Sequence, residues 1–203
     1  MMDLNIKEPT TRNAKTTFQE IEKSAIKLFY KNGYHSTTIA DITDDAGVAA
    51  GTLYLYFPSK LVLYKHLLLT FSHNIRRYIA ARVNKMESRY DKEREGVKAF
   101  IEYARKNPEM YNIIWESLYI DRDLFRDYYM SFAKRYKKGL DAAVKQGELR
   151  EIDTDVVSFV LMGIANFIGL KVVFKLGERN DDIDYIVDVV MDLIKNGLFK
   201  ERQ

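Results

Sequence analysis

The sequence predicts an all-α protein in which a three-helix N-terminal helix-turn-helix unit continues through a fourth helix into a C-terminal helical bundle. Apolar residues recur at helical spacing from Thr17 onward, and no segment alternates apolar and polar residues over the length of a strand. Only 10 glycines and 3 prolines occur in 203 residues, too few turn residues for a β-rich fold. Hydrophobic residues make up 47% and charged residues 30% of the chain, which is a globular composition.

The first helix is predicted to begin at Thr17, which has Glu20 three residues later as a capping-box partner, and to end at Gly33. Its apolar face consists of residues spaced three or four apart: Phe18, Ile21, Ala25, Leu28 and Phe29.

Two short helices are predicted next. One runs from Thr38 to Ala46 and ends at Gly47, and the other runs from Ala49 to Tyr56. Two short helices joined by a tight turn, with a helix before and a helix after, form a helix-turn-helix unit.

Pro58 and Ser59 open the longer fourth helix. Five further helices are predicted at about Asp91–Lys106, Pro108–Tyr119, Arg122–Gln146, Thr154–Leu176 and Asp181–Asn196, the last three ending at Gly147, Gly177 and Gly197. We therefore expect a helix-turn-helix domain with an N-terminal arm in residues 1–60 and a second domain in residues 61–203.

Composition excludes several classes of protein. The chain has no cysteine, which excludes disulfide frameworks, thiolate metal sites and cysteine nucleophiles. The polar N-terminus lacks the apolar run of a signal peptide, so a cytoplasmic location is expected. Residues 1–80 contain 10 Lys/Arg against 7 Asp/Glu, whereas residues 81–203 contain 22 of each. The excess positive charge of the N-terminal part favours a partner with phosphate groups.

The stretch DAGVAAGTLYLYFPSK, residues 45–60, combines small side chains with tyrosines and a lysine. In a recognition helix the small residues allow close approach to a DNA groove, and Thr52 suits a base edge. Tyr54 and Tyr56 have hydroxyls for phosphate oxygens, and Lys60 adds a positive charge. For Tyr54 the alternatives of core residue and phosphate contact both remain open, and for Phe57 a core position is favoured.

The string TTIADITDDAGVAAGTLYLYFPSK, from Thr37 to Lys60, preceded by AIKLFYKNGYHS, resembles the DNA-binding domain of the TetR family of bacterial transcriptional regulators. The resemblance covers about Phe18 to Lys65. It implies a homodimer that binds a pseudo-palindromic DNA operator, usually as a repressor, and that a small molecule in the C-terminal domain releases. The DNA-binding residues that it implies are Thr37, Thr38, Ala49, Ala50, Gly51, Thr52, Tyr54, Tyr56 and Lys60.

The chain departs from the family pattern on the recognition helix. Family members often have Ser or Lys at the positions of Ala49 and Ala50, and His at that of Leu55. Direct hydrogen bonds to bases are therefore expected to be sparse. Apolar contacts, DNA shape and an N-terminal arm with Arg12 and Lys15 in a minor groove remain alternative sources of specificity.

The segment DVVSFVLMGIANFIGLKVVF, residues 155–174, is apolar on nearly every side. Asn166 and Lys171 within it and the helical context on both sides argue against a membrane span, and no membrane partner is predicted. A helix that is apolar all round needs cover on two sides. The last two helices are therefore expected to form the interface of a homodimer.

Aromatic residues are dense between residues 106 and 136 and repeat at helical spacing. Such stripes are typical of a core, whereas tyrosine and tryptophan also suit an apolar pocket with a few polar groups. The second alternative predicts a largely apolar or aromatic effector of unknown identity, and its candidate contacts are Tyr111, Trp115, Tyr119, Phe125, Tyr128, Phe132 and Asn166.

An enzyme is the competing class. The three histidines, His35, His66 and His73, lack the spacing of a metal pair, and no phosphate loop, nucleophile elbow or dinucleotide motif occurs. We therefore expect no enzymatic activity, metal or cofactor. The alternative is an all-helical enzyme or a protein-binding adaptor that uses the C-terminal bundle without DNA binding.

Overall fold

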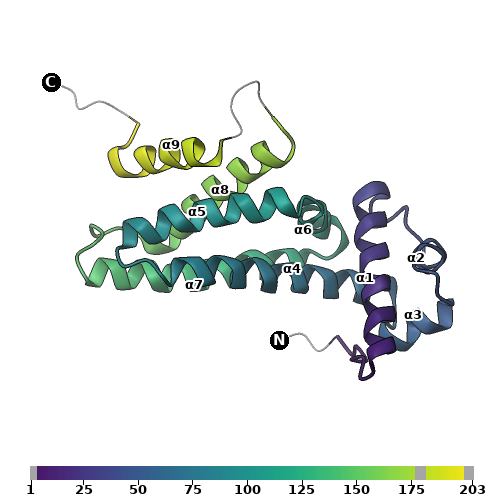
Figure 1. Ribbon diagram of the computed structural model, residues 1–203. Helices are drawn as coiled ribbons and strands as arrows, with labels where there is room; N and C mark the ends of the chain where they lie inside the picture. Colours follow the sequence, from purple (N-terminus) through teal and green to yellow (C-terminus); the bar gives the residue numbers. More distant parts are fainter. Residues whose placement is uncertain (1–3, 177–181, 199–203) are drawn as a thin grey trace. The chain divides into compact units, whose positions relative to one another are not determined.

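The computed structural model describes residues 4–176 and 182–198, and every regular element in these ranges is an α-helix. The all-α prediction is confirmed. The helices, labelled in Figure 1, are α1 (Arg12–Asn32), α2 (Ile39–Ala46), α3 (Ala50–Tyr56), α4 (Lys60–Val83), α5 (Arg89–Lys106), α6 (Glu109–Ile120), α7 (Arg122–Lys145), α8 (Thr154–Val173) and α9 (Ile183–Asn196).

The chain packs as two compact units. Unit 1 comprises the described part of residues 1–73 together with residues 109–128. Unit 2 comprises residues 74–108 together with the described part of residues 129–203. Unit 1 therefore adds α6 to the predicted helix-turn-helix, and α4 and α7 each contribute to both units. The functional boundary expected at residue 60 stays a prediction.

Helix α1 begins at Arg12 and not at Thr17. The hydroxyl oxygen of Thr11 accepts a hydrogen bond from the Ala14 N–H at 3.2 Å, so the cap lies upstream of the one predicted. The predicted end at Gly33 is confirmed, with φ at 80°. Of the predicted apolar face, Leu28 is half-buried and the others are buried: Phe18, Ile21, Ala25 and Phe29.

Helix α6 is attached to the end of α1 through a carboxylate. The two side-chain oxygens of Glu116 accept from the Tyr34 N–H at 3.1 and 3.2 Å. Gly33 leaves room for this contact, because a Cβ there would lie 2.9 Å from Glu116 Oε1. Asn112 adds a second link by donating to the Tyr30 carbonyl at 3.1 Å. The bond from Asn112 satisfies a carbonyl in the last turn of α1, where a helix leaves its carbonyls without partners, and the bonds to Glu116 satisfy an N–H just beyond the helix.

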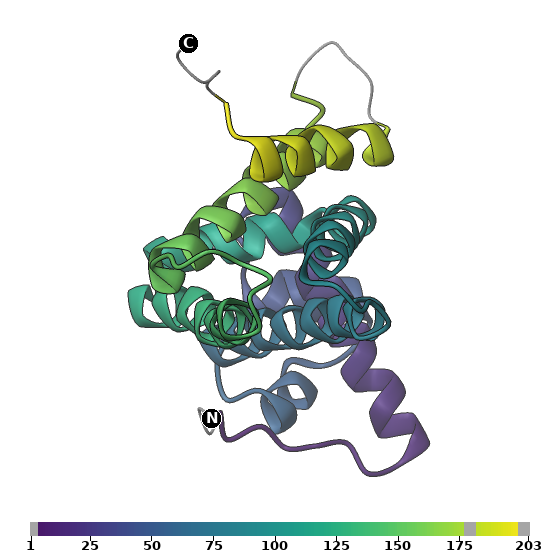
Figure 2. The same ribbon diagram turned by 90° about the vertical axis from the view of Figure 1, so that its left-hand side faces the viewer.

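The core of unit 2 lies between α5, α8 and α9, and Figures 1 and 2 both show the yellow α9 alongside the green α8. Its buried residues are Val97, Ile101, Val172, Ile183, Ile186, Val187, Val190 and Met191. Helix α8 ends at Val173 and not at Leu176, and α9 begins at Ile183. The predicted stop at Gly177 and the predicted start at Asp181 lie outside the described residues.

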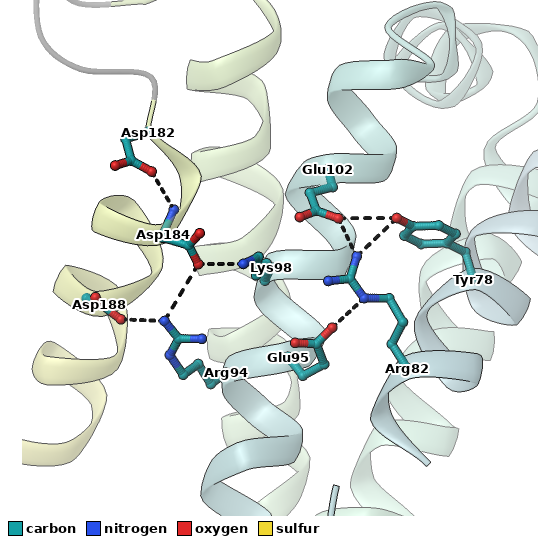
Figure 3. Close-up of polar contacts among 9 residues, drawn as sticks. All are labelled: Tyr78, Arg82, Arg94, Glu95, Lys98, Glu102, Asp182, Asp184 and Asp188. Atoms are coloured by element: carbon teal, nitrogen blue, oxygen red, sulfur yellow. Dashed lines mark hydrogen bonds and ion pairs between the residues drawn. The ribbon is translucent and has the colours of Figure 1, made fainter. Parts of the chain in front are cut away.

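Ion pairs fix α9 on α5 (Figure 3). Lys98 Nζ lies 2.5 Å from Asp184 Oδ1, and a guanidinium nitrogen of Arg94 lies 2.7 Å from Asp188 Oδ1. The Lys98 ammonium holds the pKa of Asp184 below its ordinary value. These contacts occupy the charged side of α9 and leave another side of the helix uncovered.

The uncovered sides of α8 and α9 are apolar. On α8 the exposed residues Val156, Val160 and Phe167 follow one stripe. On α9 a stripe repeats every four residues through Tyr185, Val189 and Leu193, all exposed. Within the described ranges, α8 is the one helix long and apolar enough to cross a membrane by length and composition. We call the two rows, Val156, Val160, Phe167, Tyr185, Val189 and Leu193, the α8–α9 stripes.

Candidate nucleic-acid interface

A capping box and a left-handed glycine fix the turn between α2 and α3. The Thr38 hydroxyl oxygen accepts from the Asp41 N–H at 3.1 Å, and the Asp41 carboxylate accepts from the Thr38 N–H at 2.8 Å. The hydrogen bonds from Thr38 lower the pKa of Asp41. Gly47 has φ 67° and ψ 33°, a conformation that favours glycine. The predicted limits of α2 are confirmed, and α3 begins three residues after Gly47.

Helix α3 has one buried and one exposed side. Leu53 and Phe57 are fully buried, which confirms the core position favoured for Phe57. Tyr54 is 51% exposed, so the core alternative for this residue is wrong. The exposed residues at the start and on the outer side of α3 are Ala49, Ala50, Gly51, Tyr54 and Leu55.

Two further candidates flank this exposed side. Thr52 is half-buried. Tyr56 is also half-buried, and its ring meets Phe18 edge-on, with centroids 5.4 Å apart. Tyr56 thereby links α3 to α1, and its contact with DNA stays a prediction.

Thr37 lies inside unit 1 and not on its surface. The side chain is fully buried, and its hydroxyl donates to the Gly33 carbonyl at 2.8 Å. Burial removes Thr37 from the predicted DNA contacts and gives it a role in holding the α1–α2 connection. Thr38 is exposed, and its hydroxyl donates to Asp41 Oδ2 at 2.7 Å.

The ammonium of Lys60 is directed at its own unit. Its Nζ donates to the carbonyls of Tyr34 and Thr37 at 2.8 and 2.7 Å and lies 4.3 Å from the centroid of the Tyr34 ring. Burial lowers the pKa of Lys60, and the charge of Asp41 opposes part of this shift. The two carbonyls compensate for the cost of burying the charge. Lys60 therefore joins the start of α4 to the α1–α2 connection.

Positive side chains lie at the start of α1. Arg12 and Lys15 are exposed and belong to the first turns of α1, not to an extended arm as predicted. The preceding segment contacts α3, because the Lys7 N–H donates to the Tyr56 carbonyl at 3.3 Å. Within the described part of the chain, none of these three cations forms an ion pair. They leave positive charge exposed at the start of α1 and in the segment before it.

Leu55 is the surface residue that the sequence prediction left out. It is 59% exposed, although leucine usually lies in a core. A sequence signal was available, because residues two apart in a helix point about 200° apart and Leu53 and Leu55 cannot share one buried side. The exposed side of α3 is therefore narrow and apolar, and it suits close approach to a groove.

The effector candidates of unit 1 divide into core and surface. Tyr111 and Tyr128 are buried. Trp115 and Tyr119 are exposed, Tyr119 at 84%. The rings of Trp115 and Phe125 lie with centroids 6.4 Å apart. The structure thus brings Trp115 and Phe125 together and separates Tyr119 from the packed residues.

Unit 2 contains the other two effector candidates. Asn166 on α8 donates from Nδ2 to the Tyr129 hydroxyl at 3.2 Å, and burial raises the pKa of Tyr129. The guanidinium of Arg76 lies 5.2 Å from the ring centroid of Phe132. Among the described residues, no group of three or more His, Asp or Glu side chains is placed to hold a metal ion.

Comparison with known proteins gives one family and one fold. Residues 15–67 match the model of bacterial regulatory proteins of the tetR family. The HTH-type transcriptional activator FasR of Mycolicibacterium smegmatis is 29% identical over 97 residues, which are 48% of this chain and 44% of FasR. The chain thus spans less than half the length of that relative.

Two solved structures share the fold over most of the chain. The fatty acid degradation regulator FadR of Bacillus halodurans has a TM-score of 0.79 at 20% identity, covering 90% of this chain and 96% of its own. FadR of Bacillus subtilis in complex with stearoyl-CoA has a TM-score of 0.75 at 19% identity, covering 90% and 100%. The match of residues 15–67 confirms the predicted resemblance of the helix-turn-helix region to bacterial regulatory proteins of the tetR family, and the two solved structures share the fold over most of the chain.

Proposed function

We propose that this protein is a cytoplasmic, homodimeric transcriptional repressor that binds a pseudo-palindromic DNA operator and is released by a small, largely apolar or aromatic effector. The observation that carries the proposal is the exposed side of α3, which follows a tight turn and has small residues where a groove-binding helix needs them. Lys7, Arg12 and Lys15 supply the accompanying positive charge.

The proposed homodimer rests on the α8–α9 stripes. Exposed apolar stripes on two neighbouring helices are typical of a surface that another subunit covers. A two-fold dimer places two recognition helices roughly 34–36 Å apart, one turn of DNA, and so matches a two-fold operator. The dimer is therefore a requirement for operator binding.

The proposed effector contacts are Trp115, which is exposed, and Phe125, whose ring lies beside it. The solved complex of Bacillus subtilis FadR with stearoyl-CoA makes an acyl-coenzyme A the first class to test here. A long acyl chain meets the expectation of a largely apolar ligand. The protein has one arrangement that binds DNA and one that does not. An effector that binds the second arrangement more tightly can lower operator affinity at most by the ratio of its affinities for the two arrangements.

Operator binding is tested by selecting duplexes from a random DNA library with the purified protein. We expect enrichment of an inverted repeat with half-site centres about one DNA turn apart. Three phosphate-binding cations in each subunit predict a slope of log affinity against log salt of roughly −5. Failure to enrich any sequence, or binding that salt does not weaken, would contradict the proposal. A reporter gene with the selected operator across its promoter tests whether the protein represses or activates transcription, and repression is expected.

Replacing Trp115 with alanine is expected to raise the stearoyl-CoA concentration needed for operator release by about tenfold or more, the loss of one aromatic anchor. Operator affinity without ligand is expected to stay unchanged. Fluorescence anisotropy of labelled operator measures both, with coenzyme A lacking the acyl chain as the control ligand. Trp115 is the single tryptophan of the chain, so its emission also reports ligand binding in the unmodified protein. An equal loss of affinity for stearoyl-CoA and for the operator would refute the role of Trp115 as an effector contact.

A further inference from the structure

The exposed side of α3 contains almost no hydrogen-bonding group. Successive helical residues are about 100° apart, so Ala50, Gly51, Tyr54 and Leu55 fall within an arc of about 140°. All four are exposed, and the buried Leu53 lies outside this arc. We call these four residues the α3 face. Its one polar group is the Tyr54 hydroxyl, and the neighbouring Thr52 adds a second hydroxyl and a methyl.

This composition excludes the usual bidentate contacts with bases. Guanine is read by Arg or Lys, adenine by Asn or Gln, and cytosine by Asp or Glu. The α3 face has none of these side chains. Hydrogen-bonded readout by α3 is therefore limited to the hydroxyls of Thr52 and Tyr54.

The α3 face instead fits the one apolar group that the major groove presents, the methyl group of thymine. Leu55 is 59% exposed and offers a branched apolar end. A Cβ on Gly51 would meet no atom within 4 Å, so the surface beside Leu55 is open. Small residues there let the helix approach until Leu55 reaches the base edges.

The charge around the α3 face favours DNA over an apolar partner. The segment containing Lys7 is hydrogen-bonded to the end of α3 at Tyr56. The first turns of α1, with Arg12 and Lys15, precede Phe18, which packs on the same Tyr56. The α3 face is an apolar strip, and the cations at its end form no ion pair with any residue that the structure describes. It therefore complements a groove whose floor has methyl groups and whose walls are phosphates.

We infer that the α3 face reads its operator mainly through thymine methyl groups, with Leu55 as the principal specificity-determining side chain. The inference rests on the proposed operator binding and goes further by naming the chemical group recognised. It predicts half-sites with a thymine at the position opposite Leu55.

The test uses the duplex enriched from the random library. Each thymine is replaced in turn by deoxyuridine, which removes the methyl group and keeps the base pair. Loss of a contacted methyl is expected to weaken binding about fourfold, and about sixteenfold when both half-sites are changed. In the Leu55→Ala protein, the same replacement at the thymine that Leu55 contacts is expected to change affinity less than twofold.

Matched controls separate methyl recognition from other effects. Leu55→Met keeps the apolar volume of the side chain and is expected to keep the response to deoxyuridine. Equal midpoints of thermal unfolding for Leu55→Ala, Leu55→Met and the unmodified protein verify that the variants fold. Replacing guanines by 7-deazaguanine removes the N7 hydrogen-bond acceptor from the major groove and is expected to change operator affinity less than twofold. Insensitivity to deoxyuridine, or a stronger response to 7-deazaguanine, would overturn the inference while operator binding stands. Failure to enrich any duplex would instead overturn the proposed function.

Discussion

Replacing Val160 with glutamate is expected to convert the protein into a monomer and to lower its operator affinity by roughly 10²–10⁴-fold. Val160 is 53% exposed at the middle of the apolar row on α8. In a two-fold interface the same substitution occurs on both subunits, so a carboxylate of each subunit is taken out of water without a partner. Such unpaired buried charges oppose association strongly.

The loss of affinity follows from the geometry of the operator. When one subunit has bound its half-site, the linked second subunit binds at a high effective concentration. A monomer has only the contacts of one half-site. The substitution therefore weakens DNA binding without touching α3 or any DNA-facing residue.

Two measurements test this expectation. Sedimentation equilibrium is expected to give twice the chain mass of 23.8 kDa for the unmodified protein and the single mass for Val160→Glu. Met130→Glu is the matched control, because Met130 on α7 is 50% exposed and apolar but lies outside the α8–α9 stripes. It is expected to leave mass and affinity unchanged. A Val160→Glu protein that stays dimeric would show that the subunits associate elsewhere.

The parts of the fold that depend on neighbouring residues were predictable. The limits of α2 follow from the Thr38–Asp41 capping box and from Gly47, all within ten residues of one another. The start of α1 was placed wrongly because apolar periodicity begins only near Phe18, while the polar turn from Arg12 to Thr16 has no such pattern. A second threonine cap, at Thr11, decides the start.

The parts of the site that depend on distant residues were not predictable in the same way. Glu116 and Tyr34 are 82 positions apart, and no local pattern pairs them. Thr37 and Lys60 look like surface residues of a DNA-binding motif, yet tertiary contacts bury the first and direct the second inward. Leu55 was within reach of sequence reasoning, since a helix with one buried side cannot also bury a residue two positions from Leu53.

Replacing Lys60 with methionine is expected to lower the free energy of unfolding by about 1–3 kcal/mol, because two carbonyls lose a charged donor. The carbonyls are those of Tyr34 and Thr37, and the methionine keeps much of the stem that packs beside the Tyr34 ring. The α1–α2 connection, which sets the position of α2, then loses its attachment to α4. Chemical denaturation of the purified variant measures the change.

The same variant decides between the two roles of Lys60, as a DNA contact and as a link within unit 1. A phosphate contact contributes about 0.9 to the slope of log affinity against log salt for each subunit. If Lys60 acts within its own unit, Lys60→Met lowers stability and leaves this slope unchanged. Lys15→Met is the matched control, since Lys15 is exposed on α1 and is expected to lower the magnitude of the slope with little change in stability. A reduced slope for Lys60→Met at unchanged stability would return Lys60 to the DNA surface, and other contacts, among them those of Thr37 and Glu116, would then hold the α1–α2 connection.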